Sequence, residues 1–84
     1  MKIQLLHVAD CPSTPGVLDT LRGCLQDMGV SATIEESEGA YPSPTLLIDG
    51  IDVVTGQPPQ QGACCRLDLP SPAHIHSAVR ASAP

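Results

Sequence analysis

The sequence has no Trp and no Phe, and Tyr41 is its one aromatic residue. The interior must therefore be built from Leu, Ile, Val and Ala, and large aromatic stacking surfaces are absent. Basic residues are also scarce, because four Lys and Arg stand against nine Asp and Glu, which gives a formal net charge of −5. Such a charge opposes binding to phosphate backbones and to anionic membrane surfaces, so we expect neither nucleic acid nor a membrane as a partner.

Long apolar segments are missing as well. The apolar run after Met1 is interrupted by Gln4, His7 and Asp10 before it could act as a secretory signal. No segment approaches the roughly 20 apolar residues needed to cross a bilayer. We therefore expect a cytoplasmic protein, in which thiols stay reduced and four cysteines indicate metal or catalytic roles more than disulfides. With 84 residues, the chain is expected to form one domain, residues 1–84.

The first part of the chain has the pattern of a βαβ unit. Residues 3–8 form a short apolar run that suits a buried strand. Apolar residues then recur at three- and four-residue steps from Thr14, a candidate helix cap, to Gly29, a helix terminator. Cys24 falls on this apolar face, as a core residue would. Alternation over residues 30–34 predicts a second strand, parallel to the first.

A turn and a β-hairpin are expected next. Residues 35–41 are acidic and too short for more than one turn of helix. Two β-rich runs within residues 42–54 flank Asp49 and Gly50, a strong hairpin signal. The hairpin completes a ββ pair after the βαβ unit.

The end of the chain combines an irregular segment with a helix. Residues 55–70 carry two vicinal cysteines and no periodicity, and so long a connection is usually functional or disordered. Ser71 and Pro72 form a cap and first-turn pair, after which one apolar face continues to Ser82 in a terminal helix. The expected order is thus βαβ, then ββ, then α.

Cys11 stands directly before the first predicted helix. Unpaired amides and the positive end of the helix dipole favour a thiolate there, so we expect a lowered pKa for Cys11. The alternative is a cysteine that fills space under a loop. A Cys-x-x-Cys exchanger would need a thiol at the position of Thr14, so a partner thiol must come from glutathione or from Cys64 and Cys65.

The adjacent pair Cys64 and Cys65 does not suit zinc. Consecutive side chains point apart in an extended chain, which disfavours a closed tetrahedral site. His74 and His76 lie two residues apart on the predicted helix, on nearly opposite faces, and are interpreted as surface or core-edge residues. If one cysteine of the pair faces Cys11, the thiolates form a soft-ligand site for mercury(II), copper(I) or arsenic(III). No cofactor is required, and Hg(II) or another soft metal is the candidate ligand.

The βαβ-ββα order resembles the thioredoxin fold over roughly the whole chain. The resemblance is carried by Cys11-Pro12 at the first strand-to-helix junction and by Ser43-Pro44-Thr45 at the start of a later strand. It implies an α/β domain with a four-stranded mixed sheet, in which the middle helix is shortened or missing. It also implies a cis Pro44 close to Cys11, for which a plain trans turn is the alternative.

A second resemblance concerns the cysteines. The Cys-Cys-Arg-Leu-Asp-Leu-Pro-Ser segment that begins at Cys64 is similar to the double-cysteine segment of alkylmercury lyases, and Cys11 falls where that family carries its other catalytic cysteine. The resemblance implies that thiolates grip the mercury of an organomercurial while an acid protonates the departing carbon. The family's acid is an aspartate at the position of Thr14. Asp10 and Asp68 are the substitutes in this sequence, although each also suits a solvated turn.

Three functions are compatible with these features. The first is the handling of soft metals or organomercurials by Cys11, Cys64 and Cys65, including carbon–mercury cleavage of the alkylmercury lyase kind. The second is a thioredoxin-like thiol-disulfide oxidoreductase in which Cys11 attacks and Cys64 or Cys65 resolves. The third is a non-catalytic binding module. Enzymatic activity stays open, and the expected partner is a small thiol-reactive ligand or a thiol/disulfide partner.

Overall fold

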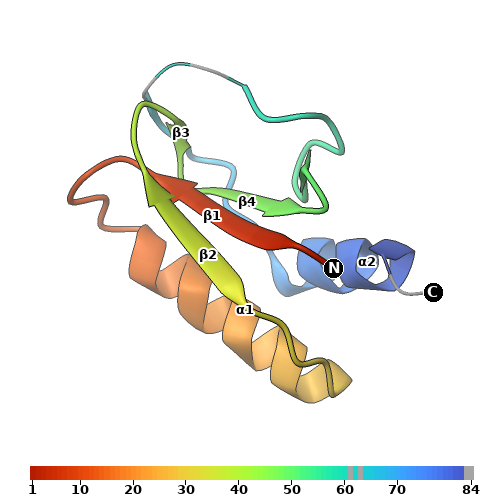
Figure 1. The fold of residues 1–84 in the computed structure, drawn as a ribbon. Coiled ribbons are helices and arrows are strands. Elements are labelled where there is room, and N and C mark those ends of the chain that lie inside the picture. The colour runs from red at the N-terminus through yellow and green to blue at the C-terminus, as the bar shows by residue number, and fades with distance from the viewer. Residues whose placement is uncertain (61, 63, 83–84) are drawn as a thin grey trace.

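A four-stranded mixed β-sheet with both helices on one face forms the framework of this α/β protein (Figure 1). The computed structural model describes residues 1–60, 62 and 64–82, with Cys65 described by its backbone. The sheet has the strand order β2-β1-β4-β5, and β3 pairs with β6 in a separate two-stranded sheet. The elements are β1 (Ile3–His7), α1 (Thr14–Met28), β2 (Ile34–Glu38), β3 (Pro42–Ser43), β4 (Thr45–Ile48), β5 (Ile51–Asp52), β6 (Cys64–Cys65) and α2 (Pro72–Ser82).

Strand β1 lies at the centre of the sheet. It runs parallel to β2, with Ile3 opposite Ile34, and antiparallel to β4, with Ile3 opposite Ile48. β5 pairs antiparallel with β4 and forms one edge, while β2 forms the other. The predicted strand and helix order and the four-stranded mixed sheet are therefore confirmed, and β6 is an addition to them.

The main core lies between the sheet and the two helices. Leu5 from β1, Leu46 from β4, Leu21 from α1 and Ile75 from α2 are all 0% exposed and belong to one cluster. Full burial of an aliphatic side chain of this size contributes about 1.5–3 kcal/mol. Cys24 is buried in the same cluster, where burial first and nearby Asp27 second raise the pKa of its thiol. The interpretation of Cys24 as a core residue is confirmed.

Helix α1 begins differently from the prediction. Ser13, and not Thr14, occupies the cap position, and its side chain makes no capping hydrogen bond. Thr14 is the first helical residue and is buried beneath the loop that carries Cys11. The predicted end at Gly29 is confirmed, because this residue has a φ of 67° and its amide donates to the last turn of the helix.

Strand β2 begins later than the alternation of residues 30–34 predicts. Val30 and Ala32 pack against the core from an irregular segment, without pairing to β1. The strand instead spans Ile34–Glu38, so the expected acidic turn at 35–41 is largely strand. Backbone pairing with β1 decides this outcome, and the glutamate side chains stay exposed because β2 is an edge strand.

The predicted hairpin turn is confirmed. Asp49 and Gly50 have φ values of 52° and 83°, and two successive positive φ values are typical of a type I′ turn. Strand β5 is shorter than the run to residue 54 predicts. The chain turns after Asp52, whose carboxylate accepts from the Val54 amide at 2.9 Å and whose carbonyl accepts from the Gly56 amide at 2.8 Å.

An irregular segment covers part of the sheet face opposite the helices. No helix joins β2 to β3, since residues 39–41 connect them directly. Leu6 is 6% exposed on this second face, and with Pro59 and Gln60 it lines a cavity of about 490 Å³. In Figure 1 the segment after β5 arches above the sheet, on the side away from the helices. The expectation that residues 55–70 lack structure is wrong at β6, which pairs with β3.

Helix α2 has the predicted start. The Ser71 hydroxyl accepts from the His74 amide at 3.2 Å, which caps the helix, and Ile75 and Val79 are buried against the core. His74 and His76 are both partly exposed, as their interpretation as core-edge residues requires. In the described part of the chain, neither helix is long and apolar enough to span a membrane.

We predict that Leu21→Ala lowers the free energy of unfolding by about 2–5 kcal/mol, because it leaves a cavity in the core that surrounding residues fill incompletely. Urea denaturation measures this change. Leu67→Ala is the matched control, since Leu67 is 97% exposed and its truncation should cost less than about 0.5 kcal/mol. Equal effects of the two substitutions would contradict the position of the core.

Candidate thiol site

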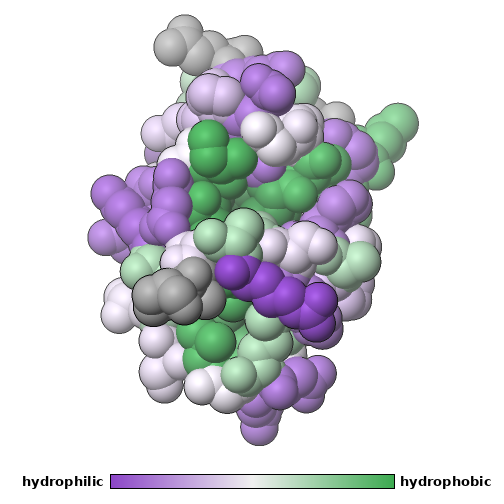
Figure 2. Space-filling view, turned by 90° about the vertical axis from the view of Figure 1, so that its right-hand side faces the viewer, coloured by the Kyte–Doolittle hydropathy of each residue, from purple (hydrophilic) through white to green (hydrophobic). Residues whose placement is uncertain are grey.

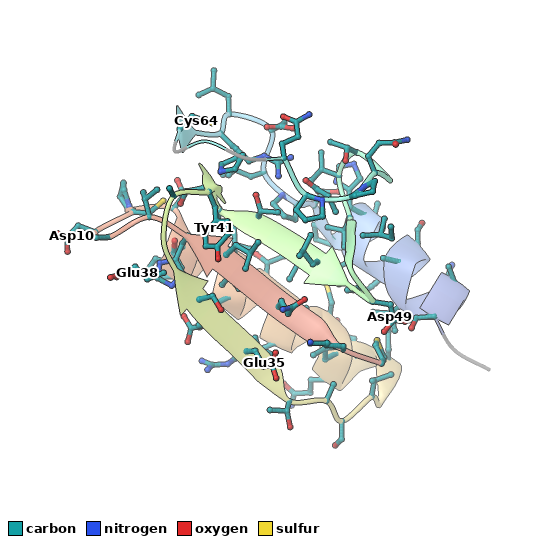
Figure 3. All side chains as sticks on the ribbon, turned by 45° about the horizontal axis from the view of Figure 1, so that its top comes forward. Asp10, Glu35, Glu38, Tyr41, Asp49 and Cys64 are labelled. Atoms are coloured by element: carbon teal, nitrogen blue, oxygen red, sulfur yellow. The ribbon has the colours of Figure 1, made fainter. Side chains whose placement is uncertain are left out.

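Cys11 lies in the turn between β1 and α1, at the end of the sheet where β1 finishes. The turn is formed by Asp10, which has a positive φ of 57°, and is closed by a 3.3 Å hydrogen bond from the Thr14 amide to the Cys11 carbonyl. Figure 3 shows Asp10 at the tip of this loop, where its side chain projects away from the protein. Cys11 itself is partly exposed.

Two buried hydroxyl groups face the sulfur of Cys11. Ser43 is 1% and Thr14 is 8% exposed, and neither hydroxyl has a hydrogen-bond partner among the described residues. Both are therefore available to donate hydrogen bonds to a thiolate. A buried hydroxyl without any partner is costly, so a charged sulfur that accepts from both is the species that this arrangement favours.

The two hydroxyls lower the pKa of Cys11 to about 7, because they are placed to donate to its thiolate. The largest cause is the Ser43 hydroxyl, followed by the Thr14 hydroxyl, while partial burial acts in the opposite direction. The amides of Ser13 and Thr14 at the start of α1 make smaller contributions. The predicted lowering is confirmed, but its main source is a side chain from β3 and not the helix end.

Pro44 directly follows Ser43, whose hydroxyl lowers the pKa of Cys11. The Ser43–Pro44 peptide bond is cis, as the thioredoxin resemblance implies. Pro44 is also among the fully buried side chains. The expected proximity of the Cys11 turn and the Pro44 segment is confirmed through the Ser43 hydroxyl.

Strand β6 brings the backbone of the vicinal cysteines beside β3, which carries Ser43. It pairs parallel with β3, so that Pro42 is opposite Cys64 and Ser43 is opposite Cys65. The Cys64 amide donates to the Tyr41 carbonyl at 3.4 Å. Ser43, whose hydroxyl lowers the pKa of Cys11, is therefore the register partner of Cys65. The side chain of Cys65 lies outside the described part of the chain.

Cys64 lines a hollow on the surface. Cys64 is exposed and lines a hollow of about 400 Å³ together with Arg66, Asp68 and Asp52. Cys11 does not contribute to the lining of this hollow. Figure 3 shows Cys64 on its short strand beside the end of the sheet that carries the Cys11 turn. Cys64 and the hydroxyl pair thus lie at one end of the molecule, and Cys64 lines a hollow to which neither Ser43 nor Thr14 contributes.

Arg66 is a site residue that the sequence patterns did not single out. Its Nη1 atom donates to Asp52 Oδ2 at 2.6 Å, and both side chains of this ion pair are 7% exposed. Nη1 also donates to Thr45 Oγ1 at 3.2 Å. An aspartate within the otherwise apolar β5 segment was the available signal, because a buried carboxylate needs a cationic partner.

Neither of the two candidate proton donors, Asp10 and Asp68, contributes to the pKa of Cys11. Asp68 accepts from Nε and Nη2 of Arg66 at 3.1 and 2.8 Å, and these hydrogen bonds lower the pKa of its carboxyl. Asp68 is therefore held as a carboxylate, which is a poor acid. Asp10 is exposed at the loop tip, and neither carboxylate contributes to the pKa of Cys11.

An apolar groove of about 530 Å³ lies between the β4–β5 hairpin and α2. Ile48, Ile51, Val53 and Ala78 contribute to its lining, and none of the three cysteines with a described side chain does. Figure 2 shows this side of the molecule, where apolar surface gathers between polar side chains. The groove is thus separate from the thiol site.

A scan of the sequence against models of known protein families found no match. A search among curated proteins with the sequence and a search among solved structures with the fold found no significant match either.

We predict that Ser43→Ala raises the pKa of Cys11 by about one unit, because the thiolate loses its strongest hydrogen-bond donor. Iodoacetamide alkylation at different pH values, followed by peptide mass spectrometry, measures the profile of each cysteine separately. In the unmodified protein the Cys11 rate should rise through a midpoint near pH 7.

Ser31→Ala is the matched control, since Ser31 is exposed in the segment before β2. Its Cys11 profile should equal that of the unmodified protein. Cys24 provides an internal control, because burial should keep it unreactive at neutral pH. A Cys11 midpoint that Ser43→Ala leaves unchanged would show that the hydroxyl does not stabilise the thiolate.

Proposed function

We propose that this chain is a small thioredoxin-like protein that uses the Cys11 thiolate to capture soft electrophiles, with a second thiol supplied by the vicinal pair. The observation that carries the proposal is the pair of buried hydroxyls of Ser43 and Thr14, which have no hydrogen-bond partner among the described residues and lower the pKa of Cys11. A thiolate is both the nucleophile of thiol chemistry and the ligand of soft metals. The arrangement therefore supports reactivity at Cys11 over a space-filling role.

The fold supports the thioredoxin-like part of the proposal. The four-stranded mixed sheet, the parallel pairing of β1 with β2, and the cis bond before Pro44 agree with the expectations for such a domain. The absence of a helix between β2 and β3, which residues 39–41 connect, agrees with a lost middle helix. Fold alone does not define activity, so the thiol site carries the functional argument.

Soft metals are the first candidate substrates. Hg(II) prefers thiolate ligands, and Cys11 together with Cys65 or Cys64 can provide two of them. Cleavage of a carbon–mercury bond needs in addition a proton for the departing carbon. Asp68 is engaged by Arg66, and Asp10 is exposed away from the sulfur. The geometry therefore favours capture of Hg(II) or of an organomercury cation over cleavage.

We predict that the protein binds one Hg(II) that resists competition by a monothiol, because two-point attachment raises the effective concentration of the second sulfur to about the millimolar range. Intact mass spectrometry after addition of Hg(II) and then of excess glutathione measures retention. Cys11→Ser should abolish retention, whereas Cys24→Ala should not, because Cys24 is buried in the core.

Retention by Cys11→Ser equal to that of the unmodified protein would contradict a shared site, since the vicinal pair would then act without Cys11. Addition of phenylmercury in the same experiment separates capture from cleavage. Capture gives a protein adduct that retains the phenyl group, and cleavage releases benzene. Catalytic benzene release would overturn the preference for capture.

Thiol-disulfide exchange is the second candidate, favoured by the Cys11 pKa of about 7. An attacking thiol exchanges fastest when its pKa is close to the ambient pH. The Cys11 thiolate would attack a substrate disulfide, form a mixed disulfide and release one substrate thiolate. A thiolate of the vicinal pair would then attack the Cys11 sulfur and release the second, so that the substrate gains two electrons and the protein becomes a disulfide.

We predict that Cys65→Ser traps a mixed disulfide between Cys11 and glutathione after treatment with oxidised glutathione, because Cys65 is the register partner of Ser43. Mass spectrometry under acid quench detects the adduct. Cys64→Ser is the matched control and should resolve the adduct, since Cys64 lines a separate pocket. The reverse result would identify Cys64 as the resolving residue.

A further inference from the structure

We propose that Arg66 is a positioning residue that ties β6 to the Pro42–Thr45 segment and thereby sets the places of the Ser43 hydroxyl and of the vicinal cysteines relative to Cys11. The inference rests on the proposed thiol function. It concerns a residue that contacts neither Cys11 nor its hydroxyl partners through its guanidinium. Arg66 acts through the chain segments that it joins.

Arg66 contacts both sides of Pro44. Its amide donates to the Ser43 carbonyl at 2.8 Å, and its Nη1 donates to Thr45 Oγ1 at 3.2 Å. The Thr45 hydroxyl in turn donates to the Pro42 carbonyl. One residue therefore bonds to the positions directly before and after Pro44, and Ser43 is among them.

The guanidinium is anchored to the main sheet through Asp52. The Nη1–Oδ2 distance is 2.6 Å and the pair is almost fully shielded from water, so the attraction is stronger than at the surface. Asp52 belongs to β5 and is opposite Leu47, and its second oxygen accepts from the Val54 amide at 2.9 Å. The arginine is thus attached to a part of the fold that is itself fixed on two sides.

The second ion pair of Arg66 is different in kind. Asp68 accepts from Nε and Nη2, but 56% of its side chain is exposed. Surface pairs of this type contribute little to stability. Asp52 and Asp68 therefore provide a matched comparison, because both are carboxylates on the same guanidinium and they differ in burial.

The two-stranded sheet needs such an anchor. β3 and β6 each contain two residues, and a two-stranded pair of this length is not stable in water by itself. Arg66 follows β6 directly, so its side chain attaches the strand to β5 and β4. Release of this side chain would leave Ser43 and the backbone of Cys65 without their common support.

The experiment compares Arg66→Met, Arg66→Lys, Asp52→Asn and Asp68→Asn by two measurements. The first is the pH midpoint of Cys11 alkylation, and the second is the rate at which oxidised glutathione produces a disulfide between Cys11 and the vicinal pair. Arg66→Met should raise the midpoint toward that of Ser43→Ala and slow the disulfide about tenfold, because the reacting groups lose their alignment. Arg66→Lys should restore part of both values.

Asp52→Asn should reproduce the Arg66→Met effects, because it removes the buried charge and keeps an oxygen that can accept from Val54. Asp68→Asn should resemble the unmodified protein. Far-ultraviolet circular dichroism identifies variants that remain folded, and Asp52→Asn carries the comparison if Arg66→Met does not fold. A folded Arg66 or Asp52 variant with an unchanged midpoint and an unchanged disulfide rate would overturn the positioning role.

The failure of this inference can be distinguished from the failure of the proposed function. A midpoint near 7 in the unmodified protein, with unchanged Arg66 and Asp52 variants, removes the role of Arg66 and leaves the Cys11 chemistry intact. A midpoint in the ordinary thiol range in the unmodified protein, without disulfide formation, overturns the proposed function and the role of Arg66 together.

Discussion

The shielded ion pair between Arg66 and Asp52 stabilises a part of the chain that aliphatic packing does not hold in place. The aliphatic core joins the helices to one face of the sheet and is contacted by Val53, but the described residues from Thr55 to Cys64 are all exposed. The ion pair therefore holds Arg66 where few apolar contacts are available. Water is nearly excluded from this pair, so the attraction between its two charges is stronger than that between exposed charges at the surface. It also requires a more specific geometry.

The ion pair and the thiol site meet at the Ser43–Pro44 bond. On one side of this bond, the Ser43 hydroxyl stabilises the Cys11 thiolate, and on the other side the Thr45 hydroxyl accepts from Arg66. Thr14 completes the thiolate environment from the helix. The Thr14 hydroxyl is the second cause of the lowered pKa of Cys11, after the Ser43 hydroxyl.

Features encoded by neighbouring residues could be predicted from the sequence. The apolar stripe of α1, its end at Gly29, the Asp49-Gly50 turn and the Ser71 cap all depend on contacts within a few positions. The start of β2 could not be predicted in the same way. Val30 and Ala32 alternate like strand residues, but pairing with β1, some 30 residues earlier, decides where the strand begins.

The same distinction between local and long-range contacts applies to the thiol site. The position of Cys11 before a helix predicted a lowered pKa, because amides at a helix start are local. The dominant Ser43 hydroxyl and the contacts of Arg66 with Thr45 and Asp52 could not be predicted, because they join residues that are distant in the sequence and that only the folded sheet brings near. The resemblance to the thioredoxin fold did indicate the neighbourhood of Pro44, but not which side chain there would touch the sulfur.

The outer edge of the sheet has a consequence for encounters between identical molecules. Strand β2 leaves its free backbone groups on an edge that carries Glu35, Glu36 and Glu38, all exposed. Two copies approaching along these edges would oppose like charges at the distance where new strand pairing begins. Electrostatic repulsion therefore opposes the pairing of β2 with a strand of a second molecule.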